Sequence, residues 1–263
     1  MKNIHPFLIL LTLALAAGCT SQKELAYLNN LPAPYSEDRF TMEIPDYKIQ
    51  NRDILYITVK AMNPDGLIMD FIGGSGASSG AISMQGESSA FLYGYDVKPD
   101  GSIILPVVGL LQAEGKTLEE IRKTLQFEFN KHYKDAIVEC KLLSFKFTVI
   151  GEVKNPGTYL NYNNYLTVLE AIGRAGGIGD FGRRDKVLVV RPDEKGSKTY
   201  TLNMQDKAIL SSEVYFLLPN DVVIIEPRKQ KIFNMNLPTY TFILGTTLSA
   251  ITTTILLIKF FEQ

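Results

Sequence analysis

The sequence is poor in the residues on which many catalytic and metal sites depend. Its 263 residues include two cysteines, Cys19 and Cys140, and two histidines, His5 and His132. Two cysteines do not make a disulfide framework, and so few histidines argue against a His-based triad or a His-rich metal site. Cys140 falls in the strand predicted at 136–143, where we expect a small buried apolar residue, because a catalytic thiol needs a partner base.

An excess of charge of one sign is also missing. The chain has 27 Lys+Arg and 28 Asp+Glu, a formal net charge of -1. This balance gives no electrostatic case for a nucleic-acid partner or an anionic membrane surface. The sequence also shows no paired acid and base, metal cluster or activated nucleophile, so we expect no catalysis, no cofactor and no metal.

The N-terminal residues 1–18 have the features of a signal peptide. Lys2 stands near the start, and an apolar run from Phe7 to Ala17 is too short to be a resident membrane helix. The ending Leu15-Ala16-Ala17-Gly18-Cys19 resembles the lipobox of bacterial lipoproteins. This resemblance implies that Cys19 is lipidated; the alternative is an ordinary signal followed by a free thiol.

Residues 45–144 are predicted to form a first domain, after a tether at 19–44 that shows no sustained periodicity. Leu55, Ile57 and Val59 alternate with less apolar residues, as in a strand with one buried face.

An insertion at 63–93 interrupts this domain. It contains the low-complexity stretch Gly73–Gly80, which cannot bury enough apolar surface to offset its ordering entropy, so we predict a mobile loop. A phosphate cradle is the alternative, but the Lys-Ser/Thr that would bind phosphate and metal is missing.

The rest of the first domain reads as strands and one helix. Two strands are expected around the Asp100-Gly101 turn. Thr117 and Glu120 have the spacing of a capping box, and a strand at 136–143 follows the helix. The apolar residues of that helix recur on one face: Leu118, Ile121, Leu125 and Phe129.

Residues 145–228 are predicted to form a second domain that opens on a strand. Lys154-Asn155-Pro156-Gly157 follows as a turn, in which Pro156 presets φ and Gly157 supplies the positive φ of a type II turn. The strand alternates in the period of a half-buried strand, with one face formed by Phe145, Phe147, Val149, Gly151 and Val153.

A short helix follows this turn. Thr167 and Glu170 make a second capping box, and Gly176-Gly177 offers a left-handed end. Further strands are expected at 187–190, 200–204 and 221–226.

The stretch Gly177–Gly182 formally matches G-x-G-x-x-G, the phosphate-binding pattern of dinucleotide folds. That pattern must follow a strand and open a helix, whereas here a helix precedes it and a strand follows. We interpret the glycines as a helix end and a tight loop. An oxidoreductase based on this loop would have to retain a cofactor on purification.

Tyr240 to Ile258 is a run of 19 residues without a charge, between Pro238 and Lys259. As a helix it would measure about 28 Å, close to the hydrocarbon thickness of a bilayer, so we predict a transmembrane helix at 238–259. A ring of helices could turn its hydroxyl-rich side toward a wet lumen or pack it between neighbours; alternatively, the hydroxyls bond to carbonyls of their own helix. The candidate lumen-facing residues are Thr241, Gly245, Thr246, Ser249, Thr252 and Thr253.

Five stretches of the second domain carry a resemblance to a known family. They are Val149–Val153, Asn155–Tyr159, Thr167–Ile172, Ala175–Gly177 and Leu218–Ile225. In this order, between a lipoprotein signal and a terminal helix, they resemble the soluble-ligand-binding β-grasp (SLBB) module of bacterial polysaccharide-export outer-membrane lipoproteins, the family of the Wza capsule translocon.

The first domain is similar to the polysaccharide export domain of that family. A Tyr, a Gly-Asp pair and an apolar strand usually open it, and Tyr47 and Asp53 match. Arg52 stands where the glycine is expected, which predicts a different turn. The turn that leads to Leu105-Pro106 and then Gly109 is also similar.

The resemblance implies an α+β chain: an export domain, one β-grasp domain and a single C-terminal transmembrane helix. It implies a homo-oligomer with periplasmic rings, lipid-anchored in the outer membrane, whose helices form a porin-like channel. Such a channel exports capsular or extracellular polysaccharide from the periplasm to the cell surface, by conduction and not by catalysis. The implied partner is an inner-membrane polysaccharide co-polymerase or tyrosine kinase.

A rival hypothesis is a glycan-binding or scaffold lipoprotein of the envelope that forms no pore and uses the helix as a second anchor. Closed-ring assembly separates the two. Tyr159, Tyr162 and Tyr165 could stack on sugar rings, but they could equally form a subunit contact.

Overall fold

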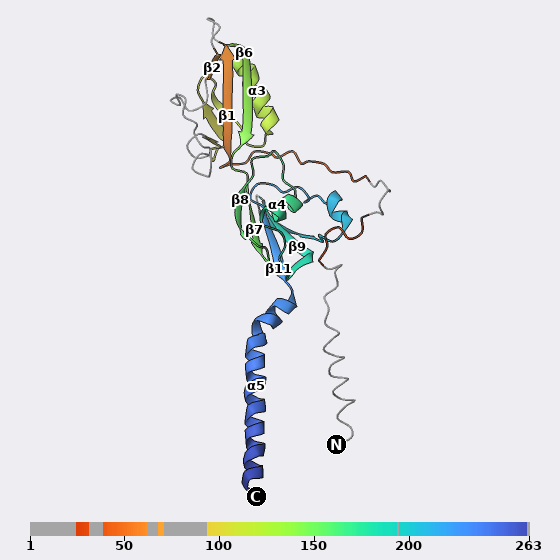
Figure 1. Ribbon diagram of the computed structural model, residues 1–263. Coiled ribbons are helices and arrows are strands. Elements are labelled where there is room, and N and C mark those ends of the chain that lie inside the picture. Colours follow the sequence, from red (N-terminus) through yellow and green to blue (C-terminus); the bar gives the residue numbers. More distant parts are fainter. Residues whose placement is uncertain (1–24, 32–38, 63–67, 71–93, 194, 262–263) are drawn as a thin grey trace.

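A computed structural model of the chain describes residues 25–31, 39–62, 68–70, 94–193 and 195–261. We refer to residues 45–144 as the first domain and to residues 145–228 as the second. The two domains and one long helix follow one another along the molecule (Figure 1). The chain is therefore a mixed α/β protein with an apolar C-terminal helix, as the sequence predicts.

The first domain is organised around its longest central strand, β1. This strand pairs antiparallel with β6 along one edge and with β2 and β3 along the other, and α3 packs against β6. Strands β4 and β5 form a separate two-stranded sheet. The elements are β1 (Ile54–Met62), β2 (Ile68–Asp70), β3 (Tyr95–Asp96), β4 (Ser102–Leu105), β5 (Gly109–Gln112), α3 (Leu118–Asn130) and β6 (Lys134–Leu142).

Apolar patterning explains how this domain is held together. One face of β1 is buried, as predicted, and the predicted face of α3 packs on it. The Thr117 hydroxyl accepts from the Glu120 backbone N–H at 3.1 Å, and the Glu120 carboxylate accepts from the Thr117 N–H at 2.7 Å. This capping box contributes about 1 kcal/mol. The core includes Leu55, Ile57, Val59, Ile121, Leu125 and Phe129.

The second domain contains a five-stranded sheet in the order β10-β9-β11-β7-β8. Strands β7 and β11 are parallel neighbours, and the other pairs are antiparallel. The elements are β7 (Lys146–Gly151), β8 (Gly157–Leu160), α4 (Val168–Arg174), β9 (Gly182–Asp193), β10 (Gly196–Leu202), a 3-10 helix (Lys207–Ser211) and β11 (Val222–Pro227).

The parallel pairing leaves no room for a side chain where β7 ends. Gly151 has φ +95°, and a Cβ there would collide with the Ile225 carbonyl of β11. The second capping box, between Thr167 and Glu170, is present and starts α4. Behind it, Gly176 has φ +78°, the left-handed helix end that the sequence predicts.

The predicted type II turn before β8 is wrong. Gly157 is not among the described residues with positive φ, and it enters β8 directly as an extended residue. The predicted position of the turn between β7 and β8 is correct, and only the turn type differs. Its geometry is set instead by β8, whose Gly157 pairs with Val149 of β7.

The prediction of a different turn at Arg52 is also wrong. Arg52 has φ +69°, the left-handed conformation that a glycine would adopt. Asp53 holds this conformation: its Oδ2 accepts from the Gln50 backbone N–H at 2.9 Å and from the Tyr47 hydroxyl at 2.8 Å. Burial and the neighbouring carboxylate raise the pKa of Tyr47, so its hydroxyl stays a donor.

Two strands, β3 and β4, lie on either side of the Asp100-Gly101 turn, as predicted; β3 pairs with β1, and β4 pairs with β5. The Lys98 backbone N–H donates to the Ser102 carbonyl across the turn at 2.9 Å. The insertion 63–93 lies outside the described residues except for 68–70, which form strand β2.

Part of the predicted tether is docked on the second domain. The Leu28 backbone N–H donates to the Met204 carbonyl at 3.0 Å, and the Asn29 N–H donates to the Gln205 carbonyl at 2.6 Å. Leu28 packs against the core of that domain. Residues 25–31 therefore act as a strap and not as a free linker.

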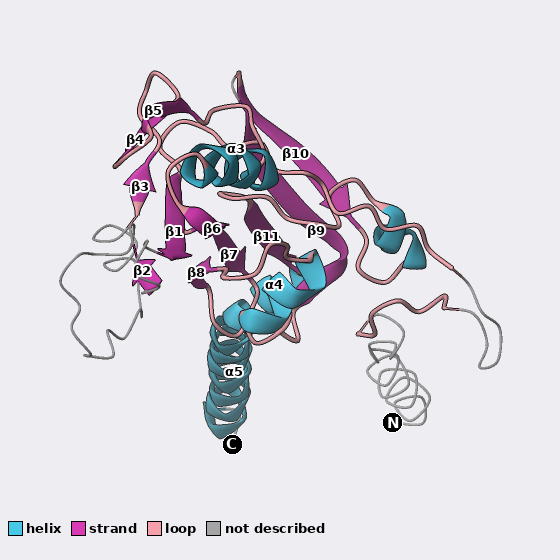
Figure 2. Cartoon of the chain, turned by 90° about the horizontal axis from the view of Figure 1, so that it is seen from above, coloured by secondary structure: helices cyan, strands magenta, loops and turns pink. Residues whose placement is uncertain are grey.

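The β9–β10 hairpin reaches back from the second domain to the first (Figure 2). Pro192 and Asp193 near its tip line a cleft together with Pro99 and Glu114 of the first domain. The domains thus meet both at their covalent junction and through this hairpin.

Candidate functional site

The helix α5 (Lys229–Phe261) leaves the second domain directly from β11. The Arg228 backbone N–H donates to the Phe181 carbonyl at 2.7 Å, and its Nε donates to the Gly182 carbonyl at 3.3 Å. Lys231 Nζ lies 2.5 Å from Glu152 Oε2. These contacts fix the first turn of the helix to the domain.

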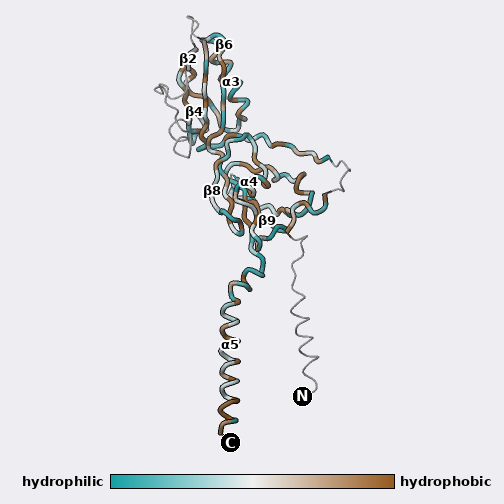
Figure 3. Tube along the Cα trace, in the orientation of Figure 1, coloured by the Kyte–Doolittle hydropathy of each residue, from teal (hydrophilic) through white to brown (hydrophobic). Residues whose placement is uncertain are grey.

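The polarity of α5 changes along its length. Its first turns are hydrophilic and the rest is neutral to hydrophobic (Figure 3). The 33 residues of α5 correspond to about 50 Å, longer than a bilayer core of about 30 Å. Within the described part of the chain, α5 is the one helix that is long and apolar enough to cross a membrane.

The start of the helix was predicted too late in the chain. Pro238 lies inside α5 and does not bound it. A proline inside a helix removes one backbone hydrogen bond and favours a bend, and the first turns of α5 run at an angle to the remainder (Figure 1). Residues 229–237 form a stalk of mixed polar and apolar residues ahead of the uncharged segment.

The predicted lumen-facing residues share one side of α5, an arc of about 140° at 3.6 residues per turn. From Ile232 to Phe261, every residue of the helix is exposed to solvent in the single chain. No other part of the described chain therefore covers the hydroxyl-rich side, which consists of Thr241, Gly245, Thr246, Ser249, Thr252 and Thr253.

Threonine hydroxyls along α5 donate to carbonyls of their own helix. Thr252 Oγ1 donates to the Leu248 carbonyl at 3.0 Å, and Thr253 Oγ1 donates to the Ser249 carbonyl at 2.8 Å. Thr247 and Thr254, on the opposite side, do the same. Both sides behave alike, so back-bonding does not distinguish a lumen face from a lipid face.

The predicted lipidation site, Cys19, lies outside the described residues. The strap begins six positions after it and is held by aromatic contacts. Tyr27 accepts from the Ile178 backbone N–H at 3.3 Å, and its ring centroid lies 5.5 Å from the Arg184 guanidinium. A cation over a ring face at this distance is favourable.

The glycine loop between α4 and β9 holds a cation and not a phosphate. Arg184 is buried, and its guanidinium donates to the carbonyls of Ile178, Gly179 and Gly182 at 3.0 to 3.4 Å. A phosphate cradle needs N–H groups directed at the ligand, whereas this loop directs carbonyls at Arg184. The geometry contradicts a dinucleotide site here.

The three candidate tyrosines differ in exposure. Tyr159 is half-buried: it stacks on Phe147 with centroids 5.5 Å apart, its hydroxyl donates to the Asn155 carbonyl, and it packs against the core. Tyr162 is 67% exposed and Tyr165 is 46% exposed. Tyr162 and Tyr165 lie beside the domain junction and remain available for a ligand or another subunit.

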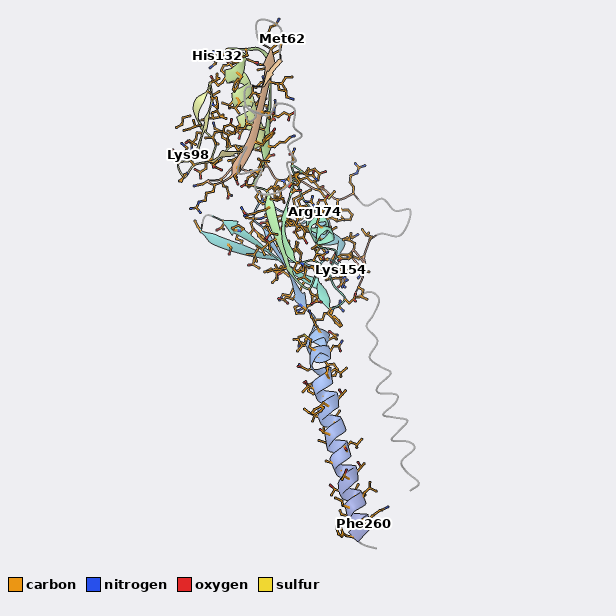
Figure 4. All side chains as sticks on the ribbon, turned by 60° about the vertical axis from the view of Figure 1, so that its left-hand side comes forward. Met62, Lys98, His132, Lys154, Arg174 and Phe260 are labelled. Atoms are coloured by element: carbon orange, nitrogen blue, oxygen red, sulfur yellow. The ribbon has the colours of Figure 1, made fainter. Side chains whose placement is uncertain are left out.

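Of the rare cysteines and histidines, Cys140 and His132 lie in the described part of the chain, and these two do not form a reactive site. Burial raises the pKa of the Cys140 thiol to about 12, so the thiol stays protonated. His132 is exposed, at the end of the first domain farthest from α5 (Figure 4). Its ring lies edge-on to Tyr133, with centroids 6.5 Å apart.

Sequence reasoning missed the polar junction between the domains. Asp53 Oδ1 accepts from the hydroxyl of Ser144, the residue at the boundary, at 2.9 Å. Arg52, Lys146 and Asn220 line a cleft beside this contact. The faint repeat of an X-Asp turn before β1 and β11 was the available signal, because both turns place a residue with positive φ at this cleft.

The described chain thus consists of two mixed α/β domains followed by an apolar helix that is long enough to cross a membrane. Residues 42–143 match the family described as polysaccharide biosynthesis/export protein, and residues 145–225 match the SLBB domain. The chain belongs to the polysaccharide biosynthesis/export protein family.

The curated relatives are named for polysaccharide export or exopolysaccharide production. The chain is 32% identical, over 53% of its length, to the EPS I polysaccharide export outer membrane protein EpsA of Ralstonia solanacearum, and covers 38% of it. It is 30% identical, over 71% of its length, to EpsA of Ralstonia nicotianae, and covers 49% of it. It is 37% identical, over 34% of its length, to the exopolysaccharide production protein ExoF of Rhizobium meliloti, and covers 23% of that protein. The chain thus spans half or less of the length of these relatives.

Proposed function

We propose that this protein is an oligomeric outer-membrane component that exports capsular or extracellular polysaccharide from the periplasm to the cell surface. The soluble domains would form periplasmic rings, and copies of α5 would enclose a hydrated path. The protein would conduct the chain, while energy and synthesis come from an inner-membrane polysaccharide co-polymerase or tyrosine kinase.

The observation that carries the proposal is the unpartnered hydroxyl-rich side of α5. A lone helix in lipid gains nothing from such a side, whereas a ring of helices can turn it toward water or pack it between neighbours. The family match and the relatives named for polysaccharide export support the substrate class.

The strap supports a second attachment to the membrane. If Cys19 is lipidated, five residues lie between it and Leu25, a reach of about 20 Å. Several acyl chains give stable attachment, because each buried CH₂ contributes about 0.8 kcal/mol. We place the protein in the outer membrane with its main body in the periplasm.

The test is assembly. The full-length protein is extracted in mild detergents, and its mass and shape are determined by native mass spectrometry and single-particle imaging. A closed ring with an axial lumen is the expected result. A monomer that persists across several mild detergents and after addition of the inner-membrane partner would contradict the pore and favour a glycan-binding or scaffold lipoprotein.

A further inference from the structure

A polar cleft of about 470 Å³ lies where the two domains meet. The loop before β1 and the boundary residues Leu143 and Ser144 form its first-domain side, and the second domain closes the other side. This volume is within the range of small-molecule sites, about 300 to 1,000 Å³. The polar side chains around it are Gln50, Asn51, Arg52, Asp53, Lys146 and Asn220.

The cleft is built from two equivalent turns, one in each domain. Arg52 has φ +69° and precedes Asp53; Asn220 has φ +68° and precedes Asp221. In each turn the aspartate Oδ2 accepts from the backbone N–H three residues earlier, at 2.9 Å for Gln50 and 2.8 Å for Leu218. The two turns therefore project the side chains of Arg52 and Asn220 at the domain junction.

The backbone at Arg52 is unusual. Asparagine visits the left-handed region routinely, but an arginine there is disfavoured by about 1 to 2 kcal/mol. Such residues persist where the surroundings enforce them and cluster at functional sites. Here the hydrogen bond from the Gln50 N–H to Asp53 stabilises the turn, and the turn places the guanidinium of Arg52 at the cleft.

The cations of the cleft are available for a ligand. Arg52 and Lys146 are exposed, and neither side chain has an ion-pair or hydrogen-bond partner within the described residues. The carboxylate of Asp53 is already used by Tyr47, Ser144 and the Gln50 N–H. The cleft therefore offers two cations without an ion-pair partner among the described residues, beside a carboxylate whose oxygens already accept three hydrogen bonds.

Acidic residues lie on the other side of the loop that carries Arg52. Glu114 and Asp193 line a neighbouring cleft together with Arg52. Neither lies within ion-pair distance of Arg52, and Asp193 pairs with Lys198 at 3.6 Å. These two acids reduce the positive potential at Arg52 more than at Lys146, because only Arg52 lines the neighbouring cleft with them.

We infer that this cleft binds an acidic sugar unit, with Arg52 and Lys146 on its carboxylate and the carboxamides of Gln50, Asn51 and Asn220 on its hydroxyls. Guanidinium and ammonium groups make strong charge-assisted hydrogen bonds to carboxylates. A second subunit would be a poorer occupant, because the centre of a protein interface is depleted of lysine and Lys146 is one of the two cations here. The inference rests on the proposed function and names a substrate class, a polysaccharide that contains uronic acids.

The experiment measures binding to the full-length protein in detergent by isothermal titration calorimetry. The probes are tri-galacturonate, the neutral trisaccharide maltotriose and inorganic phosphate. The variants are Arg52→Gly, which removes the cation and suits the backbone, and Lys146→Gln. The matched control is Lys154→Gln, which removes an exposed cation of the second domain outside the cleft.

Tri-galacturonate is expected to bind the wild type, to bind more weakly as salt rises, and to lose about tenfold in affinity in each cleft variant. Lys154→Gln retains the wild-type affinity, and maltotriose does not bind. Wild-type protein that fails to bind, or cleft variants that bind normally, overturn the inference. Phosphate that binds as tightly as the oligosaccharide overturns sugar recognition, leaving a general anion site.

Particle mass separates this inference from the proposed function. Cleft variants that lose the ring would identify the cleft as a subunit contact and overturn the inference. Intact rings with no binding overturn the sugar site alone. Binding by a protein that forms no ring overturns the pore alone.

Discussion

Single residues at the domain junction and in the core set much of the stability of the soluble body. Asp221 is fully buried, and its carboxylate meets Arg191 in a two-pronged contact, with Nε–Oδ1 at 3.0 Å and Nη2–Oδ2 at 2.7 Å. Arg191 also donates to the Phe216 carbonyl at 3.0 Å. A buried pair of this kind tolerates the loss of one partner badly.

Asp221→Asn is expected to lower the free energy of unfolding by about 3 kcal/mol, because it leaves the guanidinium of Arg191 buried without a counter-charge. Chemical denaturation of the full-length protein in detergent measures the change. The control is Asp185→Asn, which breaks an exposed pair with Arg183 and should cost less than about 1 kcal/mol. Equal losses in the two variants would contradict the prediction.

The thiol of Cys140 gives a pH-dependent prediction. Its pKa is about 12 in the folded chain, against an ordinary value of about 8.5. The folded state therefore holds a proton that the unfolded state releases, and this contribution to stability is lost as pH rises from about 9 to about 12.

Iodoacetamide at pH about 8.5 should alkylate Cys140 at least tenfold more slowly in the folded protein than in urea, because the thiolate is the nucleophile. Peptide mass spectrometry follows Cys140 separately from Cys19. Similar rates in the two states would mean that the thiol is neither buried nor protonated in the fold.

Among the elements, β6 shows how an exposed sheet edge is managed. In the described chain it pairs with β1 on one side only. On its other side, the Gln126 side chain donates to the Ala136 carbonyl, and its Oε1 accepts from the Val138 N–H at 3.2 Å. One carboxamide from α3 thus replaces a neighbouring strand, which closes this part of the edge to another chain.

Gln126→Ala is expected to destabilise the first domain by about 1 to 2 kcal/mol, because two backbone groups lose their partners. Hydrogen exchange at the Val138 amide should accelerate with it. Lys123→Ala, on the exposed face of α3, is the matched control. Unchanged exchange at Val138 in the Gln126 variant would contradict the edge-closing role.

At the scale of the whole molecule, the two domains and α5 form an extended unit (Figure 1). The helix is fixed to the second domain through Arg228 and Lys231, and the strap is fixed to the same domain through Tyr27. In a ring, the orientation of each α5 would therefore follow from the orientation of its second domain. One side of α5 should then face water in every subunit.

Single cysteines in a Cys140→Ser background test this arrangement. Ser249→Cys and Thr252→Cys should react several-fold faster with a membrane-impermeant maleimide than Ile251→Cys and Ile255→Cys, which lie on the apolar side. The reaction is measured on protein in native membranes. Equally slow labelling at all four positions would favour helices that only anchor the protein.

Local patterns predicted the elements of this chain well. Both capping boxes are present, because a T-x-x-E pair satisfies backbone groups within four residues and needs no distant partner. The start of α5 was misplaced because Pro238 is typical of a helix boundary, while contacts of Lys231 and Arg228 with the second domain extend the helix backward.

The sequence by itself determined the order of the parts: two mixed domains, then an apolar helix with hydroxyls on one side. These features depend on periodicity and composition, which are properties of neighbouring residues. Only the tertiary structure decided that residues 25–31 dock as a strap and that Arg52 and Lys146 share one cleft. Such features join residues that are distant in the chain, and their contact depends on how the two domains pack.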